Sequence, residues 1–439
     1  MYCASRGCVP AKGRGIVNTQ TGFATTPLER QVVDSEPSRF RWWVLAFLFL
    51  SILINLLDRQ VLSIVAPVLR DTFGMSATQY GQIIFGFMLG MALMQIPAGI
   101  FLDRWGARLG LTVMSCWWSA ANLVHAFARS VPQFFALRFL LGMAECGNYS
   151  GGLKVIAQWF PSCERALAAG IFNSGTLVGS IVAVPLVTFL TLRFGWQVAF
   201  IVPSTLGFLW AAVWATVYRS PQSGAADINP NAKRGGAGAL GQLFRMRQTW
   251  AVLAIRGLAG PVSQFYWFWL PEYLKRERQL SLETIGLLAW IPYLVGGLGN
   301  LGGGWFSSHL IQRGWIVDRA RKCAFLVAVV LTATSGLVPV LPSVAAAIVL
   351  ICVAVLGINA FAATFMGMLT DIFPEQYVAR VAGITGLGDS GMSMFLMLAT
   401  GMVVDRFSYL PIFISAACVP AFAFVLVLTV IRRIERCHP

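Results

Sequence analysis

Two stretches of the chain repeat one pattern: residues 160–201 read FPSCERALAAGIFNSGTLVGSIVAVPLVTFLTLRFGWQVAFI, and residues 373–414 read FPEQYVARVAGITGLGDSGMSMFLMLATGMVVDRFSYLPIFI. Both stretches open on Phe-Pro, carry Ala-Gly-Ile at the same distance from it, and close on Phe-Ile. A chance match between common apolar residues is the alternative. The identical spacing favours an internal duplication.

The composition around these repeats is that of a membrane protein. Of the 439 residues, 57% are hydrophobic and 12% are charged, whereas about 25% are charged in a soluble domain. Apolar runs bounded by charges, Pro or Gly recur along the whole chain, as in membrane-spanning helices. We therefore expect an all-α membrane protein with twelve transmembrane helices, centred in residues 42–66, 79–102, 109–128, 132–156, 166–190, 196–217, 250–271, 284–307, 323–341, 344–368, 380–402 and 409–431.

The longest polar interruption divides these spans into two sets of six. It covers residues 219–249, contains a Gly-rich basic segment, and predicts a flexible cytoplasmic linker. We expect six-helix halves at 40–218 and 250–431, a disordered cytoplasmic tail at 1–39 and a second cytoplasmic tail at 432–439. Because the repeated stretches are six spans apart, the halves share one orientation and are pseudo-symmetric about an axis along the membrane normal.

The formal charge of +15 comes from basic residues in short loops between the apolar runs. Nucleic-acid binding needs Lys and Arg clustered on a polar face, so we exclude it. Most Lys and Arg lie in alternate loops on the side that also holds both chain ends. The positive-inside rule therefore predicts a multi-pass protein of the cell (inner) membrane with both termini cytoplasmic.

The residue types that hold metals or carry out covalent catalysis form no pattern. The nine cysteines are scattered without C-x-x-C spacing, and the three histidines lack H-x-x-x-H spacing. A nucleotide motif of the form G-x-x-x-x-G-K-[ST] is also missing from the sequence. We expect no enzymatic activity, no metal and no cofactor.

Four charged residues lie inside the first and fourth spans, where charge is costly unless it is paired or hydrated. Arg138 and Glu145 are seven residues apart and share one helix face. Asp58 and Arg59 are adjacent and point about 100° apart, so at most one of them faces the centre. The ionised quartet is neutral, and each bound proton adds a positive charge that attracts a carboxylate. Ion pairs that only fix helix register are the alternative.

The loop between the second and third spans carries a recognisable motif. Residues 99–108 read GIFLDRWGAR, which resembles the cytoplasmic loop signature of the major facilitator superfamily. The resemblance implies two six-helix halves and a conformational gate made by Gly99, Asp103, Arg104, Gly106 and Arg108. The alternative to a gate is that Asp103 and Arg104 are an ordinary pair of solvated charges in the loop. In the second half, Ser308 and His309 stand where the motif has its acid and arginine, so we expect this charged loop on one half only.

Four further segments resemble the anion:cation symporters of sugar acids, the hexuronate and galactonate transporter group. They are NLLDRQVLS (55–63), LRFLLGMAE (137–145), KVIAQWFPSCER (154–165) and GIFNSG (170–175). The resemblance implies a secondary active transporter that takes up a hexuronate or aldonate with a proton, by alternating access. It also implies that Asp58 and Glu145 are the proton-coupling residues and that Arg138 is the arginine nearest the substrate.

A sugar acid needs cations for its carboxylate, hydrogen-bonding groups for its hydroxyls and a flat apolar face for its ring. The candidate substrate-binding residues are Arg59, Arg138, Tyr80, Tyr149, Lys154, Asn173, Gln264, Tyr266, Asn300 and Asn359. For Lys154 the alternative is snorkelling to water, and for Asn173 it is helix packing. Asp389, in the eleventh span, faces either the cavity or a polar neighbour.

Other functions remain as alternatives to a sugar-acid carrier. A carrier of the same fold for another small carboxylate is the first, and a channel or non-transporting membrane sensor is the second. The expected partners are a small anion, a proton as the coupling ion and the lipid bilayer, and we expect a monomer.

Overall fold

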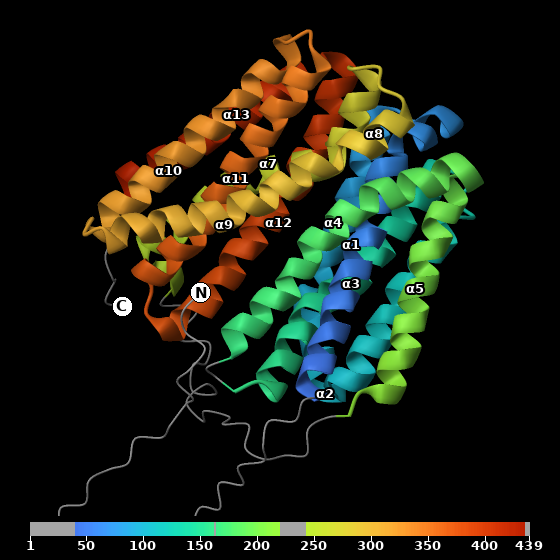
Figure 1. Cartoon of the computed structure of the whole chain (residues 1–439), viewed down its shortest axis with the longest axis horizontal. Helices are drawn as coiled ribbons and strands as arrows, with labels where there is room; N and C mark the ends of the chain where they lie inside the picture. Colours follow the sequence, from blue (N-terminus) through green and yellow to red (C-terminus); the bar gives the residue numbers. More distant parts are fainter. Residues whose placement is uncertain (1–39, 162–163, 220–242, 435–439) are drawn as a thin grey trace, which may run out of the picture. The chain divides into compact units, whose positions relative to one another are not determined.

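The computed structural model describes residues 40–161, 164–219 and 243–434, and it is built from helices (Figure 1). The predicted tail at 1–39, most of the predicted linker at 219–249, and residues 435–439 lie outside the described residues. The elements are α1 (Phe40–Phe73), α2 (Ala77–His125), α3 (Val131–Trp159), α4 (Arg165–Phe194), α5 (Trp196–Val217), α7 (Arg247–Arg276), α8 (Leu282–Leu288), α9 (Trp290–Gln312), α10 (Val317–Ala333), the 3-10 helix η2 (Thr334–Val340), α11 (Val344–Ile372), α12 (Glu375–Arg406), α13 (Leu410–Leu426) and the π-helix η3 (Val427–Ile431).

All twelve predicted spans fall on helical segments. Three of them are divided between two consecutive elements: 284–307 covers α8 and α9, 323–341 covers α10 and η2, and 409–431 covers α13 and η3. Among the described residues, nine helices are long and apolar enough to cross a membrane. One of the nine, α2, contains both the second and the third predicted span. The fourth and seventh spans are α3 and α7, whose interior charged and polar residues lower their mean hydropathy.

Helix α2 is broken at Gly106, the glycine of the loop motif. Gly106 has φ 76° and ψ 167°, a backbone conformation that a residue with a side chain rarely adopts. A methyl group at Gly110 would lie 2.6 Å from Cδ2 of Leu102, although these residues would be about 12 Å apart along a straight helix. The chain therefore turns back on itself at Gly106.

The two halves meet along α1, α2 and α4 on one side and α7, α8, α9 and α12 on the other. The closest approach is between α2 and α12, where glycines leave room for the opposite backbone. A methyl group at Gly401 would lie 2.4 Å from the carbonyl oxygen of Ala77. Helices in membranes commonly pack this closely through small residues.

Candidate functional site

Arg59 of α1 and Glu145 of α3 form an ion pair in the interior of the N-terminal half. Both Nε and Nη2 of Arg59 donate to Oε2 of Glu145, at 3.1 and 3.0 Å. The Glu145 side chain is fully buried and that of Arg59 is 24% exposed. Glu145 therefore neutralises one of the two predicted substrate arginines.

Arg138 of α3 is buried and has no counter-charge in direct contact. Nε, Nη1 and Nη2 of its guanidinium lack hydrogen-bond partners among the described residues, although only 1% of the residue is exposed. The guanidinium lies 5.8 Å from the ring centroid of Phe87, and that of Arg59 lies 5.3 Å from the same ring. A buried guanidinium without partners is costly, so this site is suited to an anionic ligand.

Asp58 of α1 points away from the Arg59–Glu145 pair and into the N-terminal half. Its Oδ1 accepts a 2.6 Å hydrogen bond from Nδ2 of Asn122, which also donates to Oγ of Ser204. The other oxygen, Oδ2, is buried without a partner in the described part of the chain. This unpaired oxygen is available to hold a proton.

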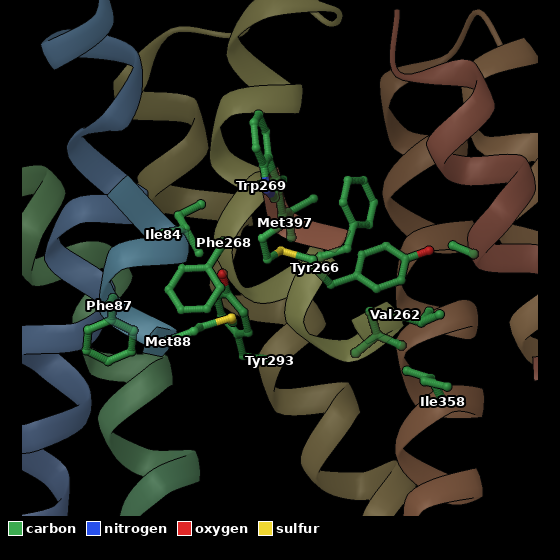
Figure 2. Packing of buried hydrophobic residues seen from close by; sticks show 14 of the residues in the cluster. Ile84, Phe87, Met88, Val262, Tyr266, Phe268, Trp269, Tyr293, Ile358 and Met397 are labelled. Carbon is green, nitrogen blue, oxygen red and sulfur yellow. The ribbon is translucent and has the colours of Figure 1, made fainter. Parts of the chain in front are cut away.

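Two of the predicted aromatic and polar ligands are engaged with protein groups. The Tyr80 hydroxyl donates to the carbonyl oxygen of Phe268 at 2.7 Å, and the Tyr266 hydroxyl lies 2.7 Å from Oγ of Ser335. In Figure 2, Phe268 projects from α7 towards Phe87 and Met88, whereas Tyr266 projects to the opposite side. The aromatic run of α7 therefore packs between helices of both halves.

A cavity between α4, α7, α9 and α11 contains three of the predicted substrate ligands. Tyr266, Asn300 and Asn359 line it together with Thr176 and Ser263. Asn300 donates to Oδ1 of Asn359 at 3.1 Å. The lining is mostly apolar and carries no charged residue, and its polar side chains can form hydrogen bonds with hydroxyl groups. Gln264 precedes the aromatic residues of α7 and is half-buried.

Tyr149 and Asn173 are exposed and lie together, with Nδ2 of Asn173 3.5 Å from the Tyr149 hydroxyl. Lys154, in contrast, is held by the loop motif: its Nζ lies 2.7 Å from Oδ1 of Asp103 and 2.8 Å from the carbonyl oxygen of Leu102. The structure therefore does not bring Lys154 to the Arg59–Glu145 pair, and its predicted substrate role remains a prediction.

The loop motif contacts helices of its own half. Besides the Asp103–Lys154 pair, Arg108 donates to the carbonyl oxygen of Ala215 at 2.8 and 2.5 Å. The side chain of Arg104 is exposed, and a methyl group at Gly99 would meet nothing within 4 Å. The gating role of these residues remains a prediction.

A second charged cluster, which the sequence analysis missed, joins the halves at the opposite end of the bundle. We call this the Arg70 end; it is where α1 ends and α2 begins. The buried Glu272 of α7 pairs with Arg70 of α1 and, at 3.2 Å, with Arg276. Arg276 also lies 2.5 Å from Asp71, and Asp405 accepts from two backbone N–H groups at the start of α2. Ion pairs between residues this far apart in sequence leave no local pattern.

In the C-terminal half, Arg256 of α7 and Asp389 of α12 form an ion pair that joins these two helices. Their Nη2 and Oδ2 atoms are 2.6 Å apart. Oγ of Ser393 donates to the other oxygen of Asp389 at 3.3 Å. A methyl group at Gly260 would lie 1.7 Å from Oδ1 of Asp389, so the carboxylate occupies the space beside that glycine. Asp389 therefore faces a polar neighbour.

A twelve-span helical bundle in two halves, with a few charged residues in its interior, is the arrangement of a membrane carrier. The chain belongs to the Major Facilitator Superfamily, whose sequence profile matches residues 48–313 and 311–438. The predicted fold and the expectation of a transporter in place of an enzyme are confirmed by this membership.

Individual proteins are similar to this chain in sequence or in fold. The chain is 28% identical to the hexuronate transporter of Escherichia coli (strain K12), covering 89% of this chain and 94% of that protein. It is 30% identical to the hexuronate transporter of Bacillus subtilis (strain 168), covering 89% and 94%. It is similar in fold to a bacterial homologue of the human lysosomal transporter Spinster, with TM-score 0.74, 20% identity and coverage of 90% and 95%.

Proposed function

We propose that this protein takes up a sugar acid, such as a hexuronate or an aldonate, together with a proton. The observation that supports this most strongly is Arg138, a buried guanidinium whose three nitrogens lack partners within the described chain. A carboxylate satisfies two of these nitrogens at once through parallel N–H···O bonds. The relatives named hexuronate transporters support a sugar acid as the source of that carboxylate.

Proton coupling follows from the acids beside Arg138. Glu145 pairs directly with Arg59, and its charge also offsets that of Arg138 more strongly than the charge of Asp58 does. Asp58 contributes a smaller compensation from across the site. When Asp58 binds a proton, Arg138 loses this compensation and attracts the substrate carboxylate more strongly. Substrate and proton therefore favour each other's binding, as symport requires. A monoanion carried with one proton moves no net charge.

Alternating access is supported by the distribution of contacts between the halves. The hydrogen bonds and ion pairs that join the described residues of the two halves lie at or near the Arg70 end. Tyr149 and Asn173, nearer the other end, are exposed. With both termini cytoplasmic, as the loop charges favour, this conformation is open to the cytoplasm. We propose that the carrier acts as a monomer in the inner membrane.

The test is transport by purified protein in liposomes. Exchange of labelled for unlabelled galacturonate or galactonate should occur, and an inward pH gradient should drive accumulation that a protonophore abolishes. Exchange also distinguishes a carrier from a channel or a sensor. Accumulation that persists with the protonophore would show that the proton is not the coupling ion.

A matched pair of variants tests the role of Arg138. Arg138→Lys keeps the charge but loses the paired geometry of the guanidinium, so the affinity should fall by at least about tenfold, the equivalent of one charge-assisted hydrogen bond. Arg129→Lys, in an exposed loop, is the control and should leave the affinity unchanged. Wild-type affinity in Arg138→Lys would assign Arg138 to structure.

A further inference from the structure

The interior charges lie on α1, α3, α7 and α12. Three arginines of these helices are at least seven residues from both helix ends. Arg59 is paired with Glu145, and Arg256 is paired with Asp389. Of these three arginines, only Arg138 has a guanidinium whose three nitrogens all lack hydrogen-bond partners among the described residues. The interior thus has one arginine available for an anionic ligand.

The Arg256–Asp389 pair lies on the cavity face of α7. Arg256, Gly260, Ser263 and Trp267 recur at intervals of four, three and four residues, which places them on one face of the helix. Ser263 and Trp267 line the cavity that also contains Asn300 and Asn359. Arg256 is seven residues from Ser263, about 10.5 Å along the helix axis. The two paired side chains are 21% and 14% exposed, so helix packing does not enclose them completely.

We propose that the carrier selects monocarboxylates over dicarboxylates, and that Asp389 enforces this selection by neutralising Arg256. This inference rests on the proposed function. A second carboxylate on the ligand would lose water in the cavity without meeting an unpaired cation, which disfavours binding. Asp389 acts through Arg256 and does not itself contact the substrate, so it is a specificity-determining residue that works by charge compensation.

Within the described residues, Asp389 pairs with Arg256 and accepts a hydrogen bond from Ser393, and no further ion pair or hydrogen bond ties this carboxylate to the half. Its Oδ1 also lies against Gly260. On α7, Gly257 lies opposite Gly388, where a methyl group would be 3.5 Å from the backbone oxygen. The helices therefore pack through glycines next to the pair, and the charges can be changed without removing that packing.

The test compares galactonate with galactarate, two open-chain acids that share a carbon skeleton and differ by a carboxylate at one end. Each competes with labelled galactonate during exchange in liposomes. In the wild type, galactarate should compete at least about tenfold more weakly. Its second carboxylate loses water without gaining a charge-assisted contact to a cation. In Asp389→Asn, Arg256 loses its counter-charge and becomes available to the second carboxylate. The difference in competition between the monocarboxylate and galactarate should therefore shrink by about tenfold. The double variant Arg256→Gln/Asp389→Asn should restore the difference.

The outcomes separate this inference from the proposed function. If the wild type exchanges no sugar acid, the proposed function fails. If it exchanges galactonate but galactarate competes equally well, the selection proposed here is overturned. An unchanged ratio in Asp389→Asn, with galactonate exchange intact, overturns the role of Asp389. If Asp389→Asn does not reach the membrane, Asp389→Ser takes its place. The ratio of competition by the monocarboxylate and by galactarate in the wild type still decides whether the carrier selects monocarboxylates.

Discussion

The buried carboxylate of Glu272 is the group whose removal should most weaken the closed Arg70 end. Its Oε1 accepts from both Arg70 and Arg276, and its side chain has no exposed area. Glu272→Gln keeps the shape and removes the charge. Because a hydrogen bond to a charged group contributes about 1.5–3 kcal/mol, we expect opening of this end to become easier by about 2 kcal/mol, or roughly 30-fold.

Asp71 provides a matched comparison within the same cluster. It also pairs with Arg276, but its side chain is 56% exposed and that of Arg276 is 40% exposed. Exposed pairs contribute at most about 1 kcal/mol, so Asp71→Asn should change the opening equilibrium by less than about fivefold. Burial, and not the number of ion pairs, should decide which residue holds the halves together.

The assay measures access to a buried position behind the cluster. Oγ of Ser63 donates to the carbonyl oxygens of Trp267 and Phe268, both at 3.0 Å. Ser63→Cys, in a background without the nine natural cysteines, reports opening through its reaction with an impermeant maleimide added on the side of the Arg70 end. The rate should rise about 30-fold in Glu272→Gln. Equal rates in Glu272→Gln and Asp71→Asn would refute the reasoning.

Two further predictions concern the proton sites and the packing of α7. Glu145→Gln and Asp58→Asn should each retain exchange of labelled substrate but lose accumulation driven by a pH gradient, since exchange needs no net release of a proton; loss of both activities at equal expression would indicate a structural or binding role. Gly260→Ala should displace the Asp389 carboxylate and destabilise the protein by about 1–3 kcal/mol, seen as a lower thermal midpoint in detergent. Gly302→Ala, where a methyl group meets nothing within 4 Å, is the control, and equal midpoints for the two variants would contradict the steric argument.

The fold could be predicted because membrane helices leave strong local signals. Apolar runs of the required length and loop charges depend on neighbouring residues only. The internal duplication is visible when the two Phe-Pro stretches are compared. The break at Gly106 shows the limit of such signals. The sequence marks the loop, but the positive φ that reverses α2 is a property of the folded backbone.

The site could be predicted only in part. Interior charges are conspicuous, so the sequence predicts Asp58, Arg59, Arg138 and Glu145 as candidate site residues. Helix periodicity places Arg138 and Glu145 on one face, but it does not reveal that Glu145 pairs with Arg59, because this depends on how α1 and α3 cross. For the same reason, the sequence indicated the separate charges of Arg256 and Asp389 but not their contact.

The close fit of Asp389 beside Gly260 has a consequence for how this protein can evolve. A larger residue cannot enter position 260 while Asp389 keeps its place, because even a methyl group would overlap the carboxylate oxygen. Replacing Asp389 first leaves Arg256 without its counter-charge. Either order of change passes through an intermediate that carries a displaced carboxylate or an unbalanced arginine. We therefore expect positions 256, 260 and 389 to be substituted together among descendants of this chain, as one coevolving unit.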